Sequence, residues 1–156
     1  MNISAATDYG MCALLYLTEI YEEDSSLLAT TEQISHSQEI PTKYLESILR
    51  QLRQAGIIES HRGPSGGFRL CRAPKEISVA DVIRALDGPL AAVRSERPED
   101  ISYKGPASHL QEVWIAVRVS LREVLEEVNL SQIVSGGLPT KVKRAIAQPG
   151  AWDRRR

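Results

Sequence analysis

Apolar positions recur at helical spacing through most of the chain, and three helices are predicted in its first third. Residues 4–22 are apolar on most faces, which indicates a helix packed between other elements. Thr30 and Gln33 form a capping-box pattern at the start of a short helix. Pro41 and Gly56 then bracket a third helix, because proline suits a first helical turn and glycine commonly ends a helix.

The third predicted helix has two distinct faces. One face is apolar and carries Tyr44, Leu45, Ile48, Leu49 and Leu52. The other face is polar and partly basic and carries Lys43, Glu46, Ser47, Arg50 and Gln54. Two short helices joined by a tight turn, the second with such an outer face, are typical of a helix-turn-helix. An amphipathic helix in an ordinary helical bundle shows the same pattern.

The segment SHRGPSGGFRL, residues 60–70, differs from the helices before it. Its three glycines and one proline break regular structure, while the flanking residues suit two short strands. A helix-turn-helix followed directly by a β-hairpin is a winged helix, so we expect a mainly α-helical fold with a small hairpin wing. When the second helix lies in the major groove of DNA, the wing tip lies near the minor groove, where Arg62 could insert.

The second half of the chain is predicted to extend this domain with a long helix. A helix with Ser78 as its N-cap completes a winged domain over 1–88, and a polar loop of unusual length follows over 89–109. An apolar stripe then continues for about five helical turns through Leu110, Val113, Trp114, Val117, Leu121, Val124, Leu125 and Val128. This stripe favours packing against the same helix of a second copy, although packing onto its own domain fits the spacing too. A short helix completes a unit over 110–138, and 139–156 is expected to be a tail.

Composition and charge favour a cytoplasmic globular protein that contacts a polyanion. The chain has 156 residues, 42% hydrophobic and 25% charged, without an apolar run long enough to span a membrane or a secretory signal. Two cysteines are too few for a disulfide framework and fit a reducing cytoplasm. The net charge is −1, but residues 41–75 hold seven basic and two acidic side chains, a local charge of +5. Such a basic patch suggests contact with a polyanion, and an ordinary solvated face shows the same pattern.

Motifs for catalysis or metal binding are missing from the sequence. There is no nucleotide-binding loop, HExxH motif or nucleophile elbow, so we do not expect an enzyme. His36, His61 and His109 are scattered without metal-ligand spacing. Cys12 and Cys71 are expected to be buried structural thiols, and a redox switch is the alternative for either. One alternative to DNA binding stays open, namely a winged helix that serves as the regulatory subunit of a metabolic enzyme.

Four stretches together resemble the Rrf-type (IscR/NsrR/CymR) family of bacterial transcription regulators. They are ISAATDYGMCALLYL, YLESILRQLRQAGII, SHRGPSGGFRL and ISVADVIRALDGPL, within roughly residues 1–135. The resemblance implies a homodimeric winged-helix regulator, most simply a repressor, that reads double-stranded DNA at a pseudo-palindromic operator. By position it implies that DNA is contacted by Thr42, Lys43, Tyr44, Glu46, Ser47, Arg50, Arg62, Gly63, Ser65 and Gly66.

The chemistry of these side chains agrees with that implied role. Lys43 and Thr42 can bind phosphate or base edges, and Glu46 can accept a hydrogen bond from cytosine N4. Arg62 suits a narrow, electronegative minor groove. The ring of Tyr44 is expected to pack inward while its hydroxyl reaches a phosphate.

The chain departs from the family pattern at one point. Many members hold an iron–sulfur cluster through three cysteines in the loop before the long helix, but residues 89–109 contain none, and Ser95, Ser102 and Ser108 lie near the expected places. Cluster iron is held chiefly by thiolates, for which neutral hydroxyls are poor substitutes. Asp8 matches the place of a carboxylate ligand in some relatives, and without cysteines we interpret it as a surface acid. We expect no cofactor, and the effector, a small molecule or a protein, stays open.

Overall fold

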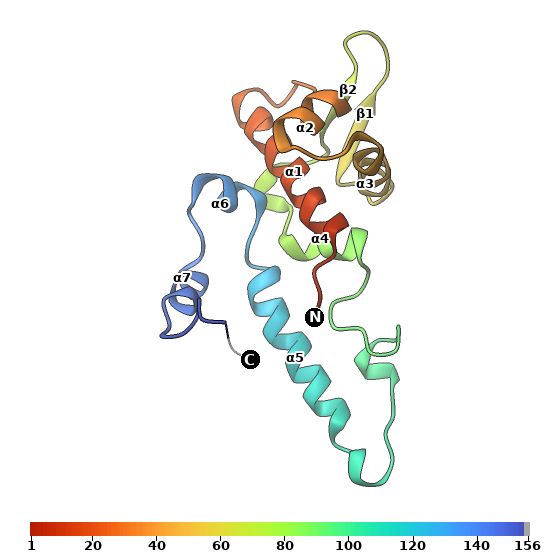
Figure 1. Ribbon diagram of the computed structural model, residues 1–156, viewed down its shortest axis with the longest axis vertical. Coiled ribbons are helices and arrows are strands. Elements are labelled where there is room, and N and C mark those ends of the chain that lie inside the picture. Colours follow the sequence, from red (N-terminus) through yellow and green to blue (C-terminus); the bar gives the residue numbers. More distant parts are fainter. Residues whose placement is uncertain (155–156) are drawn as a thin grey trace.

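The computed structural model describes residues 1–154 and consists of a helical body with a projecting arm (Figure 1). Its main elements are α1 (Ala5–Glu23), α2 (Thr31–Gln38), α3 (Thr42–Gln54), β1 (Ile58–His61), β2 (Gly67–Leu70), α4 (Val79–Leu86), α5 (Leu110–Leu125), α6 (Leu130–Ser135) and α7 (Thr140–Ile146). Short 3-10 turns cover Pro74–Glu76, Pro98–Asp100 and Gly105–Ala107. The mainly helical fold with one two-stranded hairpin confirms the predicted class. α5 and the loop before it form the arm.

Helix α1 runs through the middle of the body and packs against α2, α3, α4, α6 and β2. Its start is fixed by Ser4, whose hydroxyl accepts a hydrogen bond from the backbone of Thr7 at 3.0 Å. Gly10 allows the closest approach, because a Cβ atom there would lie 2.5 Å from the Cδ1 atom of Leu86 and 3.3 Å from the side chain of Ile48. The absence of a side chain at this position therefore lets α1 pack closely on α3 and α4.

A tight turn joins α2 to α3 as the sequence predicts. The capping box of Thr30 and Gln33 is present at the start of α2. Glu39 ends that helix in the left-handed conformation, with φ 52°. Ser35 then spans the turn, since its hydroxyl donates a hydrogen bond to the carbonyl of Ile40 at 2.6 Å. These local contacts fix the angle at which α3 leaves the body.

The apolar face of α3 lies in the core as predicted. Leu45, Ile48, Leu49 and Leu52 are at most 1% exposed and pack with Leu14 and Leu17 of α1. The opposite face of α3 is exposed to solvent. An amphipathic helix of this kind is held mainly by burial of its apolar stripe, which contributes about 1.5–3 kcal/mol for each large side chain.

The hairpin is anchored to the body by a further backbone bridge. β1 and β2 pair antiparallel from Ile58 opposite Leu70 to His61 opposite Gly67. Ala29 exchanges two backbone hydrogen bonds with Phe68, at 2.8 and 3.0 Å. Gly67 has φ 154°, and a Cβ atom on it would lie 2.7 Å from the carbonyl oxygen of Ala29. Glycine is required here because the backbone of the bridge passes too close for a side chain.

The chain returns to the body after α5, which corrects one predicted residue. The helix ends at Leu125, and Val128 beyond it is only 6% exposed. The backbone of Val79 donates to the carbonyl of Val128 at 2.9 Å, and the fully buried Leu130 shares the core of α1. Val128 is therefore covered by its own chain. The expectation that Val128 belongs to the dimer stripe is wrong, because α5 ends before it and Val128 is buried in the body.

The segment after α6 is more regular than expected. Residues 139–156 are predicted as a tail, but α7 forms within them from Thr140 to Ile146. Lys141 of α7 forms an ion pair with Glu123 of α5 at 2.7 Å. Within residues 1–154, no helix combines the length and the apolar character needed to cross a membrane.

Candidate nucleic-acid interface

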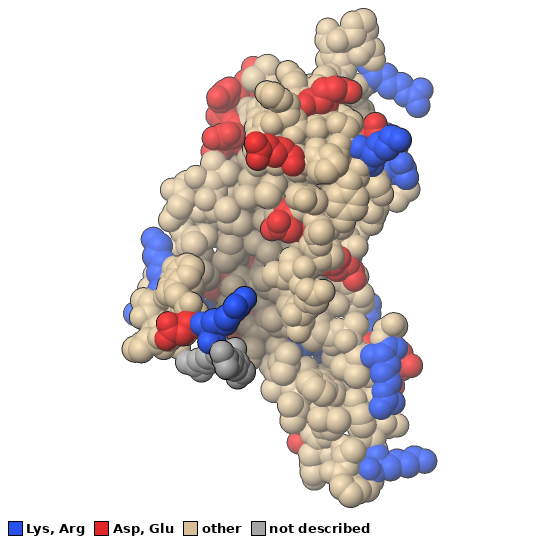
Figure 2. Space-filling model, viewed as in Figure 1, with Lys and Arg blue, Asp and Glu red and all other residues tan. Residues whose placement is uncertain are grey.

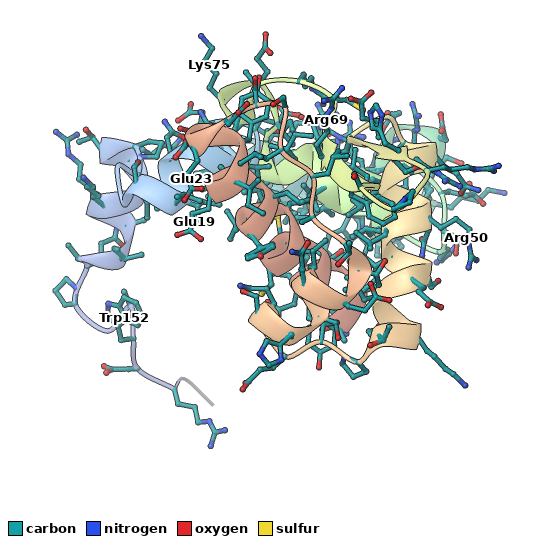
Figure 3. The ribbon with its side chains drawn as sticks, turned by 90° about the horizontal axis from the view of Figure 1, so that it is seen from above. Glu19, Glu23, Arg50, Arg69, Lys75 and Trp152 are labelled. Atoms are coloured by element: carbon teal, nitrogen blue, oxygen red, sulfur yellow. The ribbon has the colours of Figure 1, made fainter. Side chains whose placement is uncertain are left out.

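The outer face of α3 presents polar and basic side chains to solvent. Lys43, Glu46 and Arg50 are exposed, and Ser47 is half-buried beside them. Figure 2 shows basic side chains along the edge formed by α3 and the hairpin, with acidic ones over α1 and α2. In Figure 3, Arg50 projects outward from α3. Among residues 1–154, neither Lys43 nor Arg50 forms an ion pair, so their charges are available to a polyanion.

Tyr44 combines packing with exposure. Its ring lies edge-on against that of Tyr9 in α1, with ring centroids 5.5 Å apart. The residue is still 39% exposed, although the sequence pattern assigns it to the apolar face. The structure places the ring as predicted, and contact of its hydroxyl with phosphate stays a prediction.

Thr42 lies at the start of α3 but is already engaged in the turn. Its hydroxyl is 3.1 Å from that of Ser35. Because the single hydroxyl proton of Ser35 is donated to Ile40, Thr42 must donate in this pair. A phosphate oxygen accepts hydrogen bonds and cannot donate one. While this turn is intact, Thr42 can therefore accept from a base amino group but cannot bind phosphate through its hydroxyl.

The wing tip is a compact loop with exposed side chains. Arg62, Gly63 and Ser65 are exposed, and Gly66 is half-buried. The backbone of Gly66 donates to the carbonyl of Gly63 at 3.0 Å, which closes the loop. A Cβ atom on Gly66 would lie 2.2 Å from the carbonyl oxygen of His61. Gly66 is thus required by the loop itself, and Arg62 at the start of the loop stays exposed.

An open groove of about 390 Å³ lies between the wing and the N-terminus of α2. Thr31 lines one side, and Arg53 lines the other together with Arg62. The Nη1 atom of Arg53 donates to the hydroxyl of Ser60 at 3.1 Å, which ties the end of α3 to β1. Thr31 and Arg53 are not among the DNA-contacting residues expected from the sequence. For Arg53 a signal exists, since it follows Arg50 by three positions and so lies on the same face of α3.

The local charge of +5 does not all face one side. Arg69 pairs with Glu59 across the hairpin at 2.5 Å, and this guanidinium, with His61, lowers the pKa of Glu59 below its usual value. Arg72 donates to the carbonyls of Gly56 and Glu76, both at 3.3 Å. Figure 3 places Lys75 away from Arg50 and from the edge formed by α3. Among residues 1–154, the basic groups of the candidate interface that form no ion pair are therefore Lys43, Arg50, Arg53 and Arg62.

The predicted dimer stripe lies on α5, where no residue is buried. Val113, Val117 and Val124 are 50%, 40% and 36% exposed. Leu110, Trp114, Leu121 and Leu125 are half-buried, and Leu125 packs against Ala80, Ile83 and Leu90. Trp114 also donates a hydrogen bond to the hydroxyl of Tyr103 at 3.1 Å. Its placement is therefore set by the loop before α5 as well as by the stripe.

An apolar groove of about 440 Å³ runs beside this stripe. Trp114, Val117 and Leu121 form one wall, and α4 and the start of the loop form the other. An exposed apolar groove of this kind is typical of an interaction surface.

The donor groups needed for an iron–sulfur cluster are not brought together. Within residues 1–154, no three His, Cys, Asp or Glu side chains lie close enough to hold a metal. Cys12 is half-buried. Its burial and, to a smaller extent, the nearby negative charge of Asp8 raise the pKa of its thiol. Cys71 is exposed, which corrects the expectation of a buried thiol. Partial desolvation and, to a smaller extent, the negative charge of Glu59 raise the pKa of the Cys71 thiol. These thiols do not fit the family's cluster chemistry, which uses thiolates in the loop.

The fold and the exposed α3 and hairpin define a winged-helix protein of the class that regulates transcription. The family model described as "Iron-dependent Transcriptional regulator" (Rrf2) matches residues 3–136. The chain belongs to the Rrf2 family.

Similar proteins agree with this assignment. A Mycobacterium tuberculosis protein named as an HTH-type transcriptional regulator is 41% identical over 142 residues, which are 91% of this chain and 86% of that protein. Among solved structures, CymR of Bacillus subtilis, titled the global cysteine regulator, is 29% identical with a TM-score of 0.68 and coverage of 87% and 98% of the two chains. IscR of T. potens is 28% identical with a TM-score of 0.69 and coverage of 96% and 94%.

Proposed function

We propose that this protein is a homodimeric, sequence-specific DNA-binding repressor that reads a pseudo-palindromic operator without an iron–sulfur cluster. The observation that carries the proposal is the outer face of α3 next to the wing. Both are exposed on one edge of the body, and both carry basic groups without an ion pair among residues 1–154. α3 would lie in the major groove and Arg62 would enter the adjacent minor groove.

The contacts divide into two kinds. Lys43, Arg50 and the hydroxyl of Tyr44 would bind phosphates and fix the register on DNA. Glu46 would read a cytosine amino group, while Ser47 contacts the neighbouring base edge. The exposed backbone of Gly63 and Ser65 at the wing tip would pass close to the sugar-phosphate chain, while Gly66 shapes the loop.

The dimer would form through α5. The half-exposed valines and the groove beside them offer apolar surface to the same helix of a second copy. A two-fold dimer would present two α3 helices to half-sites one helical turn apart or a multiple of it.

The operator can be found by selection from a random DNA pool. Purified full-length protein should enrich a two-fold symmetric sequence, and affinity for it should fall steeply with salt because bound DNA releases counterions. Failure to enrich any sequence would contradict the proposal. Binding to a metabolic enzyme without DNA binding would support the regulatory-subunit alternative.

The cofactor part of the proposal has its own test. The protein purified without oxygen should be colourless and free of iron and acid-labile sulfide. A brown protein with stoichiometric iron would contradict it, and Asp8, Cys12 and His109 would then be the first ligands to replace.

A further inference from the structure

A further cavity, distinct from the two grooves described above, lies where the arm joins the body, away from the candidate DNA-binding surface. It encloses about 280 Å³ between the end of α4, the loop over 89–109 and α5. Figure 1 shows these three segments meeting at the base of the arm. Its charged lining consists of Arg84, Arg97, Glu99, Arg118 and Arg122.

The lining carries four guanidinium groups against one carboxylate, a formal charge of +3. Arg84 pairs with Glu126, and Arg122 is 3.8 Å from the same carboxylate. Arg84 also approaches Asp81 at 4.0 Å. The neighbouring acids Glu126 and Asp81 thus offset part of the charge from outside the cavity.

Two arginines retain hydrogen-bonding capacity. Arg97 forms no ion pair within residues 1–154. The side chain of Arg118 is only 13% exposed and is held by the carboxylate of Glu99. Its Nε atom is buried without an acceptor in the described structure. An unsatisfied donor on a buried charged group is costly.

We propose that this cavity binds a small oxyanion with two or more negative charges, bearing carboxylate or phosphate groups. Guanidinium groups bind both groups with paired hydrogen bonds, and the docking of Glu99 on Arg118 shows that a carboxylate fits this wall. The volume lies at the lower end of the ~300–1,000 Å³ usual for drug-sized ligands and suits an anion of a few heavy atoms.

The position of the cavity couples two parts of the molecule. Arg84 belongs to the helix that packs on α1 and α3, whereas Arg118 and Arg122 belong to the proposed dimer helix. An anion held between them would change how the arm sits on the body and hence the spacing of the two α3 helices. This regulatory consequence rests on the proposed function, while anion binding itself does not.

The direct test is calorimetric titration of the full-length protein with inorganic phosphate and, separately, malonate at constant ionic strength. Binding of either probe is expected, and the tighter one identifies phosphate or carboxylate as the preferred group. Arg97→Gln and Arg122→Gln should each weaken binding about tenfold, because each removes a charged donor. Arg94→Gln is the matched control, since Arg94 lies in the same loop outside the lining and stacks over Tyr103.

Glu99→Gln removes the only carboxylate of the lining and should tighten binding. Absence of heat with both probes, or equal affinity in the wild type, Arg97→Gln and Arg122→Gln, would overturn the site. Melting curves of each variant show whether a loss of binding reflects unfolding.

Operator affinity, measured with and without the anion that binds more tightly, distinguishes anion binding at the cavity from its proposed regulatory effect on DNA binding. A shift that Arg97→Gln abolishes supports regulation through this cavity. Anion binding with unchanged operator affinity overturns the regulatory role and leaves the site established. If no DNA binds at all, the proposed function fails, while calorimetry still decides the site.

Discussion

Val117 offers a quantitative test of the proposed dimer. Full burial of a valine contributes about 1.5–3 kcal/mol, so covering its exposed 40% would contribute about 0.6–1.2 kcal/mol in each subunit. The position occurs twice in a two-fold dimer, which doubles this to about 1.2–2.4 kcal/mol. Val117→Asp removes that contribution and also buries two carboxylates without partners, at several kcal/mol per ion. The dimer dissociation constant should therefore rise by about three orders of magnitude or more.

Sedimentation equilibrium over a range of protein concentrations measures this change. Val119→Asp is the matched control, because Val119 is 47% exposed on the same helix but lies almost opposite Val117 around its axis. The control should stay dimeric where Val117→Asp is monomeric. A wild type that is monomeric throughout, or equal dissociation of both variants, would refute the assignment of this face.

Three further predictions concern the body and the base contact. Gly10→Ala should lower the free energy of unfolding by about 1–3 kcal/mol, because the new methyl group meets Leu86; Gly137→Ala, whose methyl group would meet only the movable Ser135 side chain, should be near neutral in the same denaturant titration. Burial raises the pKa of Asp87, but hydrogen bonds from Ser4 and Thr7 outweigh it and leave that pKa below its usual value. The stabilisation from Asp87 is thus present above the unfolded pKa of about 3.9 and is lost as pH falls through the folded pKa, so the stability difference from Asp87→Asn should vanish in acid; a constant difference would contradict this. Glu46→Ala should relax base preference at one operator position in a repeated DNA selection, and an unchanged preference would exclude the cytosine contact.

Local sequence signals predicted the winged body well. The capping box at Thr30, the apolar face of α3 and the glycines of the hairpin all act over a few residues, so periodicity and turn chemistry identify them. The apolar stripe of α5 was also visible. The point at which the stripe ends could not be predicted. It is set by the backbone pairing of Val128 with Val79 and by the capping box of Asn129, which return the chain to the core.

Contacts between distant residues could not be predicted in the same way. The pairing of Arg69 depends on strand register, and that of Arg72 depends on where the chain turns after β2. The hydrogen bond that the Thr42 hydroxyl donates within the turn depends on the position of the Ser35 side chain, which the sequence does not show. The arginine cavity joins α4, the loop and α5, which are separated in sequence, so no local pattern marks it.

The most direct test of the central claim is the operator affinity of Arg62→Ala beside Lys75→Ala, measured by fluorescence anisotropy over a series of salt concentrations. Both residues belong to the basic segment, but Lys75 lies away from the α3 edge (Figure 3). Arg62→Ala should cost about 1–3 kcal/mol of binding and reduce the salt slope by about one, whereas Lys75→Ala should change neither. Equal effects of the two substitutions, or none from Arg62→Ala, would contradict recognition through α3 and the wing.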